Sequence, residues 1–174
     1  MTNFSFLQGA SHAEELLVRA DELGYAALAI TDECSLAGVV RAHAKAKERK
    51  WEGKLLIGSW FRLTNPDGSH ALSLLAIARN REGYGNLSEM ITLARTRIEK
   101  GSYLLHPDDF AAPPPERAHL RGLPDCSLIL LPDYPVPEFW LKALIPTNKI
   151  RRTAVQGLLR WIKERMEPLP SWAV

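Results

Sequence analysis

Two adjacent carboxylates, Asp32 and Glu33, follow an apolar run in the stretch AALAITDECSLAGVV, where a strand pattern passes directly into a helix pattern. In α/β proteins, ligands bind at the carboxyl ends of the strands. Carboxylate oxygens at such a position are the hard ligands that divalent metal ions prefer. The same side chains also suit the cap of a helix that begins at Ser35, and the spacing by itself favours this capping alternative.

The other residues that are able to bind a metal are not spaced for it. No two of the five histidines show the H-x-H or H-x-x-x-H spacing of a metal site. Cys34 and Cys126 lie far apart and form no C-x-x-C motif. We therefore expect reduced thiols, as in a cytoplasmic protein, with neither a zinc site nor a disulfide framework.

Helix and strand patterns alternate around these residues. Helical spacing is expected at 16–23, 36–44 and 91–98, and short apolar runs predict strands at 25–30, 55–63, 70–78 and 126–132. Capping-box patterns at Ser11-His12-Ala13-Glu14 and Asn86-Leu87-Ser88-Glu89 mark two of the helix starts. Apolar, non-alternating strands between amphipathic helices predict an α/β fold whose strands are buried on both faces.

The composition is typical of a soluble globular domain. The chain has 174 residues, of which 46% are hydrophobic and 24% are charged. No apolar run approaches the roughly 18 residues that a membrane span requires, and no basic leader precedes an apolar segment. These features predict one soluble, cytoplasmic domain that does not enter a membrane.

The end of the chain has a different charge from the rest. Residues 141–174 contain seven Lys and Arg against two Glu. An apolar stripe predicts an amphipathic helix, and its members are Ile150, Val155, Leu158, Leu159, Ile162 and Met166. The basic side chains that lie off this stripe include Arg151, Arg152, Arg160 and Lys163. The helix is expected to pack over an open sheet edge, to dock on nucleic acid or another anionic surface, or to have no selected role.

Three long strings resemble a known family. SFLQGASHAEELLVRADELGYAALAITDECSLAGVVRAHAKAKE, LLIGSWFRL and LLAIARNREGYGNLSEMITLARTRIEKGSYLL are similar to the N-terminal PHP (polymerase and histidinol phosphatase) domain of bacterial DNA polymerase III alpha subunits, and most similar to the error-prone branch. The resemblance covers roughly residues 3–132. It implies part of a distorted seven-stranded β/α barrel at 1–132, followed by a divergent basic tail with an added amphipathic helix at 133–174.

The resemblance also implies a depleted metal centre. Members of the family gather several His, Asp and Glu ligands around metal ions, and their first H-x-H motif is expected just ahead of Asn3. Asp32 matches an acidic ligand position, whereas Glu33 stands where a histidine is usual. Trp60, in Gly58-Ser59-Trp60-Phe61, stands where the family has a glutamate. We therefore expect at most a vestigial site for Zn, Mn or Mg at Asp32 and Glu33, and no tightly held cofactor.

The function implied by the resemblance is that of a truncated PHP-domain fragment of an error-prone DNA polymerase, in the lineage that synthesises DNA across damage. The palm domain, where aspartates bind the catalytic metals, lies several hundred residues downstream in the family, so no polymerase chemistry is expected here. DNA and other polymerase domains or subunits are the expected partners, and a homo-oligomer is an additional expectation. Two alternatives stay open, a residual metal-dependent phosphoesterase that uses Asp32 and Glu33, and a structural module that binds polymerase domains or DNA.

Overall fold

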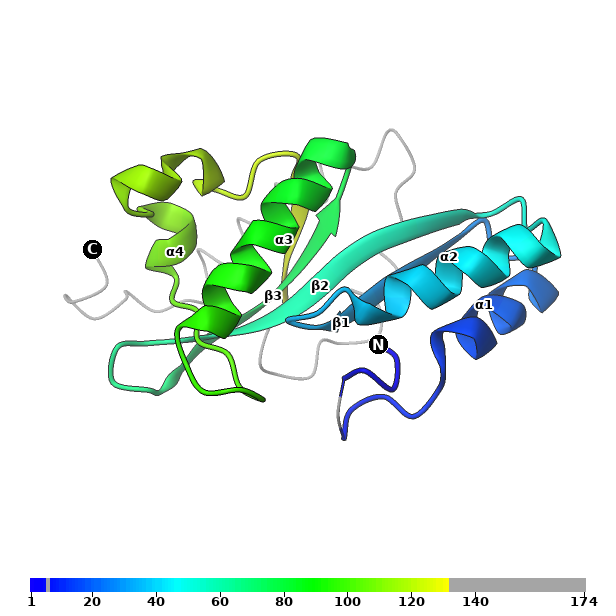
Figure 1. The fold of residues 1–174 in the computed structure, drawn as a ribbon, viewed down its shortest axis with the longest axis horizontal. Helices are drawn as coiled ribbons and strands as arrows, with labels where there is room; N and C mark the ends of the chain where they lie inside the picture. Colours follow the sequence, from blue (N-terminus) through cyan, green and yellow to red (C-terminus); the bar gives the residue numbers. More distant parts are fainter. Residues whose placement is uncertain (6, 132–174) are drawn as a thin grey trace, which may run out of the picture. The chain divides into compact units, whose positions relative to one another are not determined.

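The computed structural model describes residues 1–5 and 7–131. The predictions for the basic tail, including its amphipathic helix and its proposed DNA-binding side chains, concern residues outside these ranges. Within the described residues, the elements follow one another in the predicted order of helix, strand, helix, strand, strand, helix and strand (Figure 1). Two short helical segments, which the sequence did not predict, precede the last strand.

The bounds of the elements agree with the sequence patterns to within a few residues, except at one helix start. The helices are α1 (Ala13–Glu22), α2 (Ala37–Arg49), α3 (Arg81–Thr96), α4 (Asp108–Ala111) and the 3-10 helix η1 (Pro115–Leu120). The strands are β1 (Ala27–Glu33), β2 (Lys54–Thr64), β3 (His70–Ala78) and β4 (Cys126–Leu131). No helix in the described ranges is both long and apolar enough to cross a bilayer.

The four strands form one sheet in the order β1-β2-β3-β4. β1 and β2 run parallel because α2 carries the chain back to the starting edge of the sheet. β2 and β3 are antiparallel and are joined by a tight turn in which the amide of Gly68 donates to the carbonyl of Asn65. β4 adds antiparallel to β3. The predicted α/β class is confirmed, and among the described strands β1 and β4 stand at the two ends of the sheet order rather than closing into a barrel.

The described helices cover one face of the sheet. Ile57 packs in a cluster with Ile30 and Val39 beneath α1 and α2. Phe61, four residues further along β2 and therefore on the same face, packs with Leu87, Met90 and other residues beneath α3 and α4. Trp60 and Leu75, on the opposite face, are only half-buried. The prediction that the strands are buried on both faces is therefore wrong for the described residues.

The first turns of two helices differ from the predicted capping boxes. α1 begins one residue later than predicted, with His12 as its N-cap and the Glu15 carboxylate accepting from the His12 amide at 2.8 Å. α3 begins at Arg81, where the side chain of Asn80 accepts from the Gly83 amide at 2.9 Å. Asn86 therefore lies inside the helix, and its side-chain amide donates to the Pro124 carbonyl. A pattern match cannot distinguish a cap from an interior residue that bonds to a distant loop.

Candidate functional site

Asp32 lies at the carboxyl end of β1 and is completely buried. One carboxylate oxygen accepts from the Thr2 amide at 2.5 Å and from the Ser5 hydroxyl at 2.9 Å. The other oxygen accepts from the Thr2 hydroxyl at 2.8 Å. A buried carboxylate is costly unless donors surround it, and charge-assisted hydrogen bonds of this kind are among the strongest in proteins. Thr2 and Ser5 therefore satisfy a group that would otherwise be strongly destabilising.

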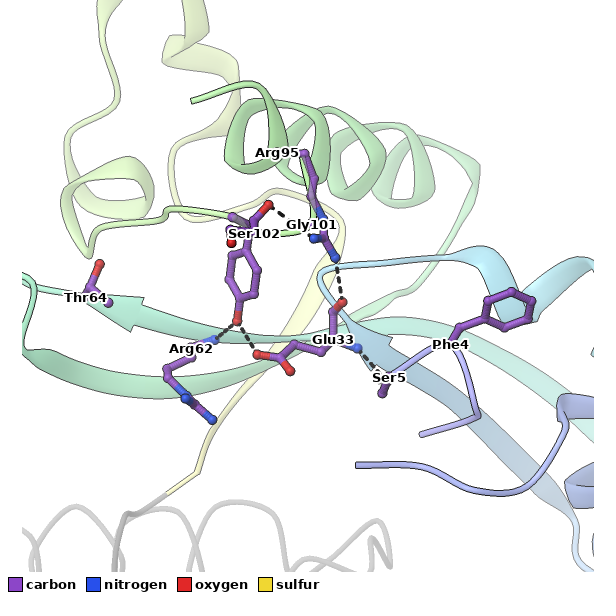
Figure 2. A pocket seen from close by; sticks show the side chains of 9 residues that line it. Phe4, Ser5, Glu33, Arg62, Thr64, Arg95, Gly101 and Ser102 are labelled. Carbon is purple, nitrogen blue, oxygen red and sulfur yellow. Dashed lines mark hydrogen bonds between the residues drawn. The ribbon is translucent and has the colours of Figure 1, made fainter. Parts of the chain in front are cut away.

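Glu33 follows Asp32 in the chain but has a different environment. Successive side chains of a strand point to opposite faces of the sheet. The Glu33 carboxylate accepts from the Tyr103 hydroxyl at 2.8 Å (Figure 2). It also accepts from the side-chain amide of Gln8. The two adjacent carboxylates therefore share no hydrogen-bond donor among the described residues. Ser5 connects them only through the backbone, because its hydroxyl donates to the Asp32 carboxylate and accepts from the Glu33 backbone amide at 2.9 Å.

Neither carboxylate caps the following helix. The N-cap of α2 is Leu36, which has no side-chain capping bond. The turn before it is held instead by Ser59, whose hydroxyl accepts from the Ser35 amide at 3.1 Å and donates to the Asp32 carbonyl at 2.8 Å. Cys34 within this turn has a φ of 45°, which turns the chain away from the strand. The capping alternative is therefore wrong, because the donors nearest the carboxylates come from elsewhere in the fold.

Arg95 from α3 holds the turn after β1 in place. Its guanidinium donates to the carbonyl oxygens of Glu33, Cys34 and Ser102, each at 3.2 Å. The guanidinium also lies 5.4 Å from the centre of the Tyr103 ring, in a cation–π contact. Sequence reasoning missed both Arg95 and Tyr103, because they lie more than 60 positions from Glu33 in the chain and match no short functional motif.

These residues line an open cleft of about 540 Å³ at the carboxyl ends of β1 and β2 (Figure 2). Its lining consists of Phe4, Ser5, Glu33, Arg62, Thr64, Arg95, Gly101, Ser102 and Tyr103. The backbone amide of Arg62 donates to the Tyr103 hydroxyl at 2.8 Å, so that the hydroxyl links β2 to Glu33. Two arginines and one carboxylate give the cleft wall a net positive charge.

The groups near the cleft that are able to act as nucleophiles are held in their neutral forms. Burial raises the pKa of the Cys34 thiol to about 12, although the nearby Arg95 opposes this shift. Burial is also the main cause that raises the pKa of Tyr103, and its hydrogen bond to Glu33 acts in the same direction. Neither group is deprotonated near neutral pH. The described cleft therefore offers no activated thiolate or phenolate.

The side chain opposite Glu33 on the neighbouring strand is Trp60. The Arg62 guanidinium lies 5.5 Å from the centre of the Trp60 ring. An indole has no lone pair to offer a metal ion, so Trp60 supplies no ligand beside Glu33. Across the described parts of the chain, no group of three or more His, Cys, Asp and Glu side chains is placed to hold a metal.

Comparison with known proteins places the chain in a family. The family model described as the PHP domain matches residues 1–119. The chain belongs to the PHP domain family. An error-prone DNA polymerase of Bordetella parapertussis is 63% identical over 131 residues, covering 75% of this chain and 12% of that protein. An error-prone DNA polymerase of Ralstonia pickettii is 57% identical over 139 residues, covering 79% of this chain and 13% of that protein.

The chain matches the N-terminal PHP region of these relatives and spans about an eighth of their length. A crystal structure described as a metal-dependent phosphoesterase from Bifidobacterium adolescentis is 20% identical to this chain, with a TM-score of 0.41. The match covers 86% of this chain and 42% of the phosphoesterase chain.

The PHP family implies a metal centre, and the donor set described here does not fit one. A catalytic metal ion requires three or more protein ligands and an open coordination position. Both oxygens of Asp32 already accept hydrogen bonds from neutral donors, and Asp32 is closed to solvent. Glu33 is engaged by Tyr103 and Gln8, and Trp60 occupies the facing position. The described residues therefore do not form a metal centre that could support hydrolysis.

Proposed function

We propose that this chain is a PHP domain of the error-prone DNA polymerase family that has no catalytic activity of its own. It serves as a structural domain that binds the other parts of a polymerase during cytoplasmic DNA synthesis across damage. The identity to error-prone polymerases supports the assignment to this line. Other polymerase domains and DNA are its proposed partners. The nucleotidyl-transfer chemistry of DNA repair would then belong to those partner domains, which bind the catalytic metals.

One observation carries the proposal that the domain has no catalytic activity. The acidic residue that matches the family's metal position, Asp32, uses its carboxylate to hold Thr2 and Ser5. A carboxylate whose two oxygens already accept three hydrogen bonds within the chain is poorly placed to bind a metal ion or a substrate. A structural role for the domain is therefore better supported than the phosphoesterase alternative, which requires Asp32 and Glu33 to act together.

The purified chain is expected to show neither phosphoester hydrolysis nor primer extension. The reason is that the described residues supply no three-ligand metal site and no activated nucleophile. Release of p-nitrophenol from a phosphodiester, in the presence of Mn²⁺ or Zn²⁺, tests the first activity, and a primed template with dNTPs tests the second. Turnover that co-elutes with the pure chain and disappears in Asp32→Ala would contradict the proposal.

A structural domain of this kind is also expected to bind the polymerase that it belongs with. We expect this chain to co-elute in size-exclusion chromatography with the Bordetella parapertussis polymerase from which the matching 131 residues have been deleted. The full-length relative is the matched control, because its own PHP region already occupies the binding surface. Equal elution of this chain with either protein, or with neither, would count against the structural role.

A further inference from the structure

The N-terminal segment, defined here as residues 1–5 and 7–11, is attached to the sheet through side chains that solvent does not reach. Thr2 and Asp32 are fully buried, and Ser5 is 1% exposed. The segment folds back on itself, because the Asn3 amide donates to the Ser11 carbonyl and the Ser5 amide donates to the Thr2 carbonyl, each at 2.9 Å. It therefore presents its hydroxyl groups to Asp32 from a preformed loop.

Two glycines allow this close approach. A Cβ atom at Gly38, in the first turn of α2, would lie 2.7 Å from an oxygen of Asp32 and 3.0 Å from the hydroxyl oxygen of Thr2. A Cβ atom at Gly9 would lie 2.2 Å from the Thr2 carbonyl oxygen. Either side chain would displace the segment from the carboxylate. The fit around Asp32 is therefore built into α2 and into the segment itself.

The same segment forms one wall of the cleft. Phe4 and Ser5 belong to the lining together with Arg95 and Tyr103, and Figure 2 shows Ser5 next to Glu33. Ser5 links the two parts, since its hydroxyl donates to Asp32 and accepts from the Glu33 amide. Gln8 adds a second link through the Glu33 carboxylate. When the segment detaches, both carboxylates lose donors and the cleft loses a wall.

We propose that Asp32 is the anchor of a hydrogen-bonded strap, the N-terminal segment, which closes the strand end that a metal centre would otherwise occupy. The strap controls access to the cleft. When it is docked, it buries Asp32. When it is detached, Asp32 is exposed and the cleft is wider. Asp32 acts as a positioning residue through Thr2 and Ser5. This inference does not depend on the proposed polymerase partner, because it concerns contacts within the chain.

Hydrogen–deuterium exchange on the full chain tests the strap directly. In Ser5→Ala we expect amide exchange in residues 1–11 to rise by at least roughly tenfold, because the variant loses the hydrogen bond to the buried carboxylate and the bond accepted from the Glu33 amide. Asp32→Asn is expected to raise it further, because loss of the negative charge weakens the hydrogen bonds from both Thr2 and Ser5. Exchange in the β2–β3 ladder should stay at the wild-type level in both variants.

Matched controls are available on exposed surface. Ser127→Ala and Asp108→Ala remove an exposed hydroxyl and an exposed carboxylate that lie outside this network. Both are expected to leave the exchange of residues 1–11 unchanged. A uniform rise over the whole chain in Ser5→Ala would indicate general destabilisation and overturn the strap. Unchanged exchange in both Ser5→Ala and Asp32→Asn would overturn it as well.

Calorimetry with Mn²⁺ or Zn²⁺ alone separates an anchor from a metal ligand. If Asp32 is an anchor and not a ligand, the wild-type chain and Asp32→Asn should show the same heat of metal binding. A sub-micromolar site that depends on Asp32 would show that the carboxylate is a ligand and would overturn the proposal. This readout differs from the turnover and co-elution experiments, so that a failed strap and a failed polymerase assignment give different results.

Discussion

Phe61→Ala is expected to remove about 3–5 kcal/mol from the free energy of unfolding, which is a large share of the stability of an ordinary domain. The Phe61 side chain is fully buried at the centre of the cluster beneath α3 and α4. Its ring meets that of Phe110 edge-on, with 6.4 Å between the ring centres. Removal leaves a cavity between β2 and α4 that the surrounding backbone cannot fill.

Urea unfolding followed by circular dichroism measures this loss. Phe61→Leu is expected to cost less than Phe61→Ala, because it keeps more of the buried volume. Val40→Ala, at a helix position that is 74% exposed, is the surface control and should change the stability by no more than about 0.5 kcal/mol. Equal midpoints for Phe61→Ala and Val40→Ala would mean that the α3 cluster does not support the fold.

Asp109→Asn is expected to cost about 3 kcal/mol at neutral pH, because it breaks a partly buried ion pair and leaves Arg97 without its counter-charge. Asp109 is 6% exposed, and its two carboxylate oxygens accept from the two terminal nitrogens of Arg97 at 2.6 Å each. The His106 amide donates to the same carboxylate at 2.8 Å. These bonds join the end of α3 to the loop that carries Tyr103.

This loss of stability is expected to depend on pH. Burial by itself would raise the pKa of Asp109, but the hydrogen bonds from Arg97 and His106 outweigh burial and place that pKa below its usual range. A depressed pKa in the folded state contributes stability above the unfolded pKa of about 3.9, and this stability is lost as the pH falls through the folded pKa. The wild-type chain should therefore be more stable than Asp109→Asn at pH 7, and the difference in stability should shrink in acid.

Melting curves of the two proteins between pH 7 and pH 2 test this prediction. Asp108→Asn, at the exposed neighbouring position, is the matched control and should follow the wild-type curve. A difference in melting temperature between wild type and Asp109→Asn that stays constant down to pH 2 would contradict the prediction. It would show that Asp109 stabilises the fold through packing and not through its charge.

The order of the elements and the position of the two carboxylates were predictable from the sequence. Hydrophobic periodicity reports which side chains are buried, and that signal is local, so β1, α2, β2 and β3 lie where the patterns placed them. The change from an apolar run to Asp32 and Glu33 likewise located a strand end. The family resemblance was also readable from the sequence, since it rests on strings of residues in order, and the comparisons confirm it.

The environment of the carboxylates was decided by tertiary structure alone. Asp32 meets Thr2, which is 30 positions away in the chain, and Glu33 meets Tyr103, which is 70 positions away. Such contacts depend on how the loops and helices pack on the sheet. The start of α3 at Arg81, with Asn80 as its N-cap, and the coverage of one sheet face have the same origin. Local pattern determines whether a residue is buried, but packing between distant segments determines which donors, charges and rings it meets there.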